Sequence, residues 1–231
     1  MTDTVVRCTG VSRIYQDDSV PVRALQNVDF EVKSGDFVSL AGPSGSGKST
    51  LLNIIGGLDR PDAGTVQVDG QILNELSESE LSDLRLLKMG FVFQAYNLIP
   101  VLSARENVEF IMQLQGVGAA ERAERAIAIL KELGLEGMTD RRPGEMSGGQ
   151  QQRVAVARAI VTKPVLLLAD EPSANLDSST TRELLELLRT LNEDHGVTIV
   201  TATHDPQVMS YAKRQVRLRD GQIIEDSATP S

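Results

Sequence analysis

Residues 42–49 read Gly-Pro-Ser-Gly-Ser-Gly-Lys-Ser and match the pattern G-x-x-x-x-G-K-[ST]. The apolar run Phe37–Ala41 precedes this segment, and a helical pattern over residues 50–55 follows it. Glycine has no Cβ, so such a loop can wrap closely around an anion, and the N-terminus of the next helix adds positive potential. A chance glycine-rich loop would not explain this strand–loop–helix context. The segment predicts a phosphate-binding loop, with expected contacts from Gly42, Pro43, Ser44, Gly45, Ser46, Gly47, Lys48, Ser49 and Thr50.

Two carboxylates stand where such a loop needs a metal ligand and a base. In loops of this kind the lysine, Lys48, reaches the β- and γ-phosphates, and the serine, Ser49, binds Mg²⁺. Asp170 and Glu171 end the apolar run Val165–Ala169, and open α/β sheets bind ligands beyond the carboxyl ends of their strands. We expect Asp170 at the Mg²⁺ and Glu171 as the base that polarises the attacking water. Without the loop, two solvated carboxylates would be the simpler interpretation.

Two further segments are candidates for the same chemistry. His204 directly follows the β-branched run Thr198–Thr203, at the edge of the sheet where the ligand is expected. A lone histidine is more often structural, but this position favours a functional role. Residues 147–150, Ser-Gly-Gly-Gln, begin a helical pattern, and the free N–H groups of a helix start can bind an anion. An ordinary helix cap is the alternative, and one nucleotide needs only one such loop.

The order of the patterns predicts an α/β chain with a mostly parallel sheet. Buried runs at 37–41, 165–169 and 198–203 suit central parallel strands, and shorter strands with hairpin turns are expected near Asp69-Gly70 and Asp220-Gly221. Residues 77–161 are expected to be mostly helical, and the apolar face of one helix there is expected to include Ala126, Ile127 and Leu130. Capping boxes are expected to start helices at Ser77 and Ser103.

Composition limits the classes of function. The 231 residues carry 23 Lys and Arg against 32 Asp and Glu, a net charge of −9, which argues against a nucleic-acid partner. The longest stretch without a charged residue, 89–104, is shorter than the ~20 apolar residues of a membrane span. A single cysteine excludes an internal disulfide.

Taken together, these segments resemble an ATP-binding cassette nucleotide-binding domain, in order and spacing, over nearly the whole chain. The matching elements are Walker A (Gly42–Ser49), the Q-loop glutamine (Gln94), the LSGGQ signature (Met146–Gln150), Walker B (Val165–Asp170), the catalytic glutamate (Glu171), the D-loop (Ser173–Asp177), the switch histidine (His204) and the adenine-stacking aromatic (Tyr15). Met146 replaces leucine, a volume-conserving change. Ser173-Ala174 stands where relatives have Thr-Gly, which affects the expected D-loop geometry.

The resemblance implies one ATPase domain over residues 1–231. It would have a RecA-like P-loop core, an N-terminal antiparallel β subdomain and a helical subdomain inserted at approximately 95–162. It implies ATP and Mg²⁺ as cofactors, and catalytic roles for Glu171, His204, Lys48 and Gln94. Nucleotide contacts are implied for Tyr15, Ser147, Gly148, Gly149, Gln150 and Asp177, and metal contacts for Ser49, Gln94 and Asp170.

The resemblance also implies a mechanism and partners. Two copies would face head to tail as a homodimer with two ATP molecules between them, each held by one Walker A loop and the other copy's signature helix. Hydrolysis would separate the copies. The segments 56–61, 97–100 and 169–172 are most similar to the branch of lipoprotein-release, macrolide-export and cell-division ATPases. Membrane permease subunits would dock near the Q-loop, at roughly 94–108, on the cytoplasmic face of the inner membrane. The apolar segment 96–102 would then be exposed; subdomain core is the alternative.

The expected function is therefore an ATP-hydrolysing subunit that powers a membrane transporter or extractor, by export or by lipoprotein- or macrolide-type mechanical transport. Two alternatives stay open. One is a regulatory ATPase of the cell-division type, which would turn ATP over slowly. The other is a soluble ATPase acting on nucleic acid or ribosomes, against which the acidic charge counts.

Overall fold

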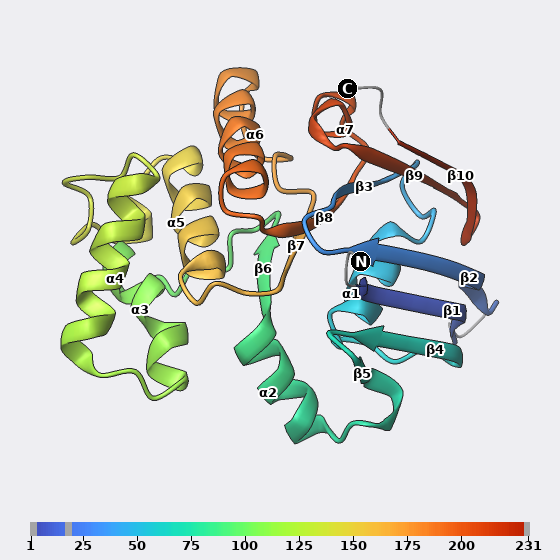
Figure 1. Cartoon of the computed structure of the whole chain (residues 1–231). Coiled ribbons are helices and arrows are strands. Elements are labelled where there is room, and N and C mark those ends of the chain that lie inside the picture. The colour runs from blue at the N-terminus through green and yellow to red at the C-terminus, as the bar shows by residue number, and fades with distance from the viewer. Residues whose placement is uncertain (1–3, 17–19, 229–231) are drawn as a thin grey trace.

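The computed structural model describes residues 4–16 and 20–228, whose strands form two sheets (Figure 1). The smaller sheet is antiparallel and has the order β2-β1-β4-β5. Its strands are β1 (Thr4–Tyr15), β2 (Val22–Lys33), β4 (Ala63–Val68) and β5 (Gln71–Ile72). The larger sheet has the order β10-β9-β3-β8-β7-β6 and is parallel except at β10. Its strands are β3 (Phe37–Ala41), β6 (Met89–Phe93), β7 (Leu166–Asp170), β8 (Thr198–Thr203), β9 (Arg214–Arg219) and β10 (Gln222–Ala228).

Helices cover the larger sheet and form a separate group at one side of the molecule (Figure 1). The α-helices are α1 (Lys48–Ile55), α2 (Glu78–Lys88), α3 (Ala104–Leu114), α4 (Ala119–Glu132), α5 (Gly148–Ile160), α6 (Ser178–Glu193) and α7 (Pro206–Tyr211). Short 3₁₀ turns occur at Leu73–Glu75 and Pro143–Glu145. Within residues 4–16 and 20–228, the helices lack the length and apolarity needed to cross a membrane.

The expected α/β class and the antiparallel N-terminal subdomain are confirmed. Every residue of β3 and β8 is buried, as expected of central parallel strands that are covered on both faces. The predicted hairpin turns are present, and Asp69 (φ 47°) and Gly70 (φ 81°) both adopt the left-handed conformation of a two-residue type I′ turn. The second turn, between β9 and β10, has the same character.

The helix α1 lies in the main core between the two sheets. Leu51, Ile54 and Ile55 are at most 1% exposed and pack among apolar residues of both sheets. A second core joins the other face of the large sheet to α3, α4, α5 and α6. Because α1 is anchored on both sides, the loop at its N-terminus has a rigid support.

The stretch 77–161 is mostly helical, as predicted, but one detail and one side chain differ from expectation. The stretch also contains β6, which pairs with β7 as the edge of the large sheet. A short apolar run such as Met89–Phe93 has no periodicity that separates a strand from a buried helix turn. On α4, Ala126 and Leu130 are buried as expected, whereas Ile127 is 47% exposed. The two predicted capping boxes are confirmed.

Candidate functional site

The loop between β3 and α1 depends on glycines for steric reasons. The φ angle is +152° at Gly42 and +102° at Gly47, values that favour glycine. A Cβ on Gly47 would also lie 2.5 Å from the carbonyl oxygen of Ala24. Lys48 begins α1, and its Nζ donates to the carbonyl oxygens of Gly42 (2.8 Å) and Pro43 (2.9 Å). The ammonium group therefore lies across its own loop, beside the N-terminus of a helix, where an anion is favoured.

Ser49 and Asp170 bring two oxygen groups together next to this loop. The Ser49 hydroxyl donates to Asp170 Oδ1 at 2.9 Å, which joins the start of α1 to the end of β7. Burial raises the pKa of Asp170; the hydrogen bond from Ser49 opposes this, the charge of Glu171 adds to it, and Lys48 opposes it. A Mg²⁺ ion would favour the ionised form.

This oxygen pair fits magnesium. Mg²⁺ is commonly bound by one or two protein ligands together with substrate phosphates, rather than by an all-protein cage. Among the described residues, no group of three His, Cys, Asp or Glu side chains able to hold a metal is found. Ser49 and Asp170 would supply the protein ligands, and Gln94 offers an amide oxygen at the same pocket.

Glu171 and His204 meet at the carboxyl ends of adjacent strands. His204 Nδ1 lies 2.7 Å from Glu171 Oε1, and the Thr203 hydroxyl donates to Glu171 Oε2 at 3.2 Å. The side chain of Glu171 is 17% exposed and that of His204 is 68% exposed. The pairing of β7 with β8 brings these two residues together, since Asp170 lies opposite Ala202. The carboxylate is thus oriented by two neighbours and still open to solvent.

One pocket of about 580 Å³ gathers most of the predicted residues. Its walls are formed by Tyr15, Val22, Ala24, residues 43–50, Gln94, Glu171 and His204. Tyr15 ends β1 and Gln94 follows β6, so the pocket is assembled from both sheets. Val22 and Ala24 were not predicted, because an apolar residue on a strand carries no signal of a ligand.

The signature residues and Asp177 lie elsewhere in the chain. Ser147 caps α5, its hydroxyl accepting from Gln150 N–H while Gln150 Oε1 accepts from Ser147 N–H. Asp177 caps α6, and hydrogen bonds from the Ser179 hydroxyl and from Thr180 lower the pKa of its carboxyl. Neither segment lines the pocket at the phosphate-binding loop of its own chain.

Contacts to the segment around Gln94 were missed by sequence reasoning. Tyr96 and Asn97 adopt left-handed conformations, and the half-buried Arg158 on α5 donates to both of their carbonyl oxygens, at 2.9 and 2.6 Å. Asn175 donates to the carbonyl oxygen of Gln94 at 2.9 Å. These contacts join residues far apart in sequence. A single arginine or asparagine gives no sequence signal of the carbonyl group that it contacts.

The model of the ABC transporter family matches residues 25–174, which is more than half of the chain. The chain therefore belongs to the ABC transporter family, and its fold is that of an ABC ATPase domain. The cassette MJ0796 of Methanocaldococcus jannaschii, an ABC transporter cassette whose structure is dimeric, superimposes with a TM-score of 0.91 at 43% identity, over 98% of this chain and 99% of that one. A second dimeric structure of that cassette, in a post-hydrolysis state bound to ADP and Pi, superimposes equally well.

Similar proteins include whole chains and parts of longer ones. An uncharacterised ABC transporter ATP-binding protein of Thermotoga maritima is 48% identical over 95% of this chain and 93% of its own length. The macrolide export ATP-binding/permease protein MacB of Syntrophobacter fumaroxidans is 46% identical over 96% of this chain. This chain spans about a third of the length of that longer relative.

Proposed function

We propose that this chain is the ATP-hydrolysing subunit of a membrane transporter or extractor, driven by ATP-dependent dimerisation. The single observation that carries the proposal is the pocket in which the phosphate-binding loop faces Glu171 and His204. The likeness to macrolide export proteins supports export or mechanical extraction as the coupled work.

In the proposed reaction, water attacks the γ-phosphorus of ATP, the bond to the bridging β–γ oxygen breaks, and ADP and phosphate leave. Glu171 orients the water and accepts its proton, while His204 holds the carboxylate and contacts the γ-phosphate. Lys48 exchanges its two loop carbonyls for phosphate oxygens. Ser49, Asp170 and Gln94 would hold Mg²⁺, which neutralises phosphate charge when bound.

The position of the signature residues supports a head-to-tail homodimer. The first-turn amides of a helix have no partner within that helix, and the Ser147 cap satisfies the amide of Gln150. The amides of Gly148 and Gly149 remain suited to an anion, yet they lie outside their own chain's pocket. A second copy would bring its nucleotide to them. The D-loop residue Asp177 would lie at the same interface.

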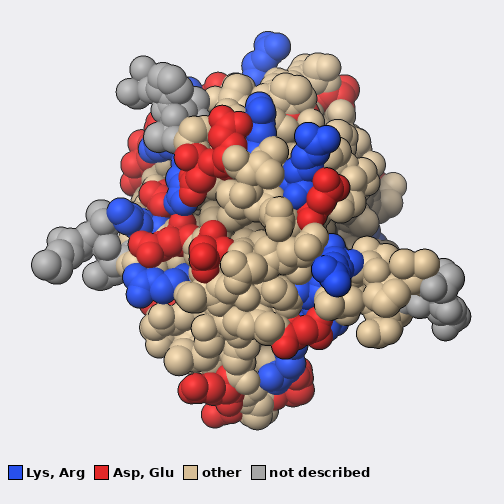
Figure 2. Space-filling view, turned by 90° about the vertical axis from the view of Figure 1, so that its right-hand side faces the viewer, with Lys and Arg blue, Asp and Glu red and all other residues tan. Residues whose placement is uncertain are grey.

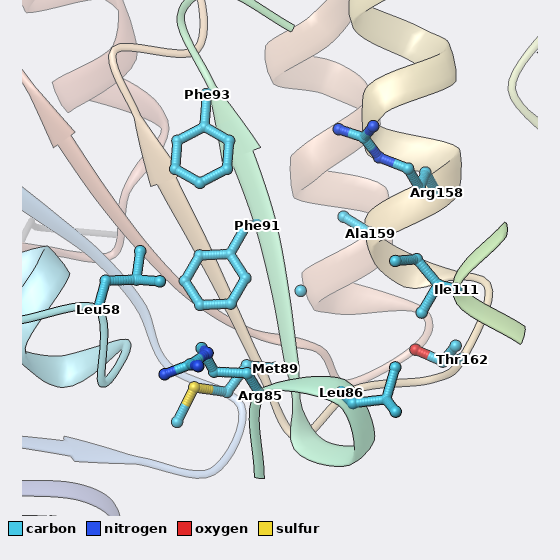
Figure 3. Close-up of a pocket in the computed structure, with 11 residues that line it drawn as sticks. Leu58, Arg85, Leu86, Met89, Phe91, Phe93, Ile111, Arg158, Ala159 and Thr162 are labelled. Atoms are coloured by element: carbon cyan, nitrogen blue, oxygen red, sulfur yellow. The ribbon is translucent and has the colours of Figure 1, made fainter. Parts of the chain in front are cut away.

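A groove beside Gln94 suits the docking of a permease helix. It has a volume of about 370 Å³ and lies between β6, α2, α3 and α5 (Figure 3). Phe91 and Phe93 point into it from the same face of β6 and stack 5.9 Å apart, and Leu58 faces them at 47% exposure. An amphipathic helix could place its apolar face there. Within the segment 96–102, Val101 is 70% exposed, whereas Leu98 packs against the helical core.

The remaining expectations belong to the same proposal. Residues 95–162 would move as a helical subdomain against the core, and the protein would sit on the cytoplasmic face of the inner membrane through its permease. Figure 2 shows one face of the molecule, where Lys and Arg are interspersed with Asp and Glu. That face, as drawn, shows no continuous basic track.

The proposal is tested by affinity capture of the Glu171→Gln variant with ATP from detergent-solubilised membranes of the native cell. Wild type with ADP and the Lys48→Ala variant with ATP serve as controls. Recovery of a membrane-spanning protein with the Glu171→Gln variant alone would support the proposed function. Recovery of ribosomal or nucleic-acid-associated proteins alone would contradict it.

A further inference from the structure

Two contacts fix the orientation of the Tyr15 ring at the edge of the pocket. Tyr15 is the last residue of β1 and is 38% exposed. The Cζ atom of Arg13 lies 4.7 Å from the ring centroid, so the guanidinium covers one face of the ring. The Tyr15 hydroxyl donates to Asp59 Oδ2 at 2.7 Å. A ring that could swing freely at the surface is therefore held at its face and at its tip.

Arg13 and Asp59 belong to a tight ionic cluster. Arg13 pairs with Asp59 at 2.8 Å and with Asp62 at 3.0 Å, and its side chain is only 23% exposed. Asp62 in turn accepts from the backbone N–H of Ile14 at 2.6 Å. The cluster therefore fastens the segment after α1 to the end of β1, and both Asp59 carboxylate oxygens are in use.

The buried helix α1 lies between the phosphate-binding loop and the segment that contains Asp59 of this cluster. Lys48 is the first residue of α1, and Asp59 follows the end of α1, with its N–H donating to the carbonyl oxygen of Asn53 at 3.3 Å. The phosphate-binding loop and the Asp59 contact to Tyr15 thus flank the same helix. In the sequence, residues 56–61 indicate only a similarity to one branch of the family. The structure shows that Asp59 accepts a hydrogen bond from Tyr15.

We propose that Arg13 and Asp59 are positioning residues that hold Tyr15 as a stacking platform, so that the site prefers purine over pyrimidine nucleoside triphosphates. The inference rests on the proposed function, in which the triphosphate lies at Lys48. With Arg13 on one face of the ring, the base stacks on the other. The cation offsets the negative charge of the ring face, and the two fused rings of a purine gain more contact area than one pyrimidine ring.

Holding the ring before binding lowers the entropic cost of stacking. Ordering a side chain at a binding surface opposes association, and a ring that is already oriented avoids this cost. The preference for purines should therefore depend on the contacts of Arg13 and Asp59 with Tyr15, which we call the clamp. The presence of an aromatic ring alone should not be enough. Loss of the clamp should weaken the binding of the base and leave the binding of the phosphates unchanged.

The test measures the dissociation constants of ATP, CTP and tripolyphosphate, each with Mg²⁺, for the full chain. The variants are Arg13→Met, which removes the cation, and Tyr15→Phe, which keeps the ring and removes only the bond to Asp59. Arg7→Met is the matched control, because Arg7 lies on the same strand and pairs with Glu31 instead. Tyr15→Phe keeps the ionic cluster intact and so guards against a folding defect in Arg13→Met.

We expect both clamp variants to weaken ATP binding about three- to tenfold, with a smaller effect on CTP and none on tripolyphosphate. Arg7→Met should match wild type for all three ligands. An unchanged ratio of ATP to CTP affinity, or an equal loss for all three ligands, would overturn the clamp. If wild type binds none of the three, the proposed function itself fails; if it binds all three and the variants behave like it, only the clamp fails.

Discussion

Replacing Glu171 with glutamine is expected to separate nucleotide binding from hydrolysis. Glutamine has the same shape, so the Thr203 hydroxyl, 3.2 Å from Glu171 Oε2, can still donate to an amide oxygen. The 2.7 Å contact with His204 Nδ1 can persist with the amide N–H as donor. The change therefore removes the capacity to accept a proton while it keeps the local packing.

The expected effects on hydrolysis and on stability differ greatly in size. A general base contributes about 10²–10⁴ in rate, which corresponds to about 2.7–5.4 kcal/mol of activation free energy. The free energy of unfolding should change by under about 1 kcal/mol, since the exchanged hydrogen bonds are similar in number. Hydrolysis should thus fall by far more than any change in stability explains, and an ATP-bound dimer should accumulate.

The assay combines three measurements on one preparation: single-turnover release of phosphate, ATP affinity by calorimetry, and molecular mass by light scattering with ATP. Glu225→Gln is a matched control, because Glu225 is an exposed carboxylate on β10 that pairs with Arg217 at 3.4 Å. Hydrolysis by Glu171→Gln within about threefold of wild type would refute the assignment of Glu171 as the base.

Three further predictions follow from single contacts. Lys48→Ala should weaken Mg-ATP binding about 10–100-fold in calorimetry, because a charge-assisted contact to phosphate is lost; unchanged affinity would count against the loop. Asp177→Ala should lower Tm more than Asp177→Asn, which still caps α6. Because the pKa of Asp177 is lowered in the folded state, its ionised form stabilises the protein above about pH 4, and this stabilisation is lost as the pH falls through the folded-state pKa. A difference in Tm between wild type and Asp177→Asn that grew on acidification would contradict this. Gly90→Ala should lower the free energy of unfolding in urea by about 1–3 kcal/mol, because its Cβ would lie under 3.0 Å from the carbonyl oxygen of Ala159, whereas Gly144→Ala, with open space around it, should stay within about 0.5 kcal/mol.

The strand β6 could not be identified from its sequence pattern alone. Met89–Phe93 follows a helix directly and is too short to display a period, so the sequence pattern does not separate it from the mostly helical stretch 77–161. Its identity as a strand comes from pairing with β7, a partner more than seventy positions away in the chain. The exposure of Ile127 has a similar origin, because the width of the buried face of α4 depends on what packs against it.

Local chemistry explains which features the amino-acid sequence determines by itself. A phosphate-binding loop is one continuous segment whose glycines, lysine and serine act on adjacent atoms, so Gly42–Ser49 identifies it directly. Turn dipeptides and capping boxes are local in the same way, and they are confirmed at Asp69-Gly70 and at Ser77 and Ser103.

The tertiary structure decided which distant residues meet. The order β3-β8-β7 places strands side by side that are far apart in the chain, and this brings His204 to Glu171. The ion pairs after α1 bring Asp59 to Tyr15 in the same manner. Such contacts depend on register and on packing around α1, which are properties of the whole sheet. No short stretch of sequence predicts these contacts, because neither side chain carries a recognisable pattern by itself and only the fold brings the two together.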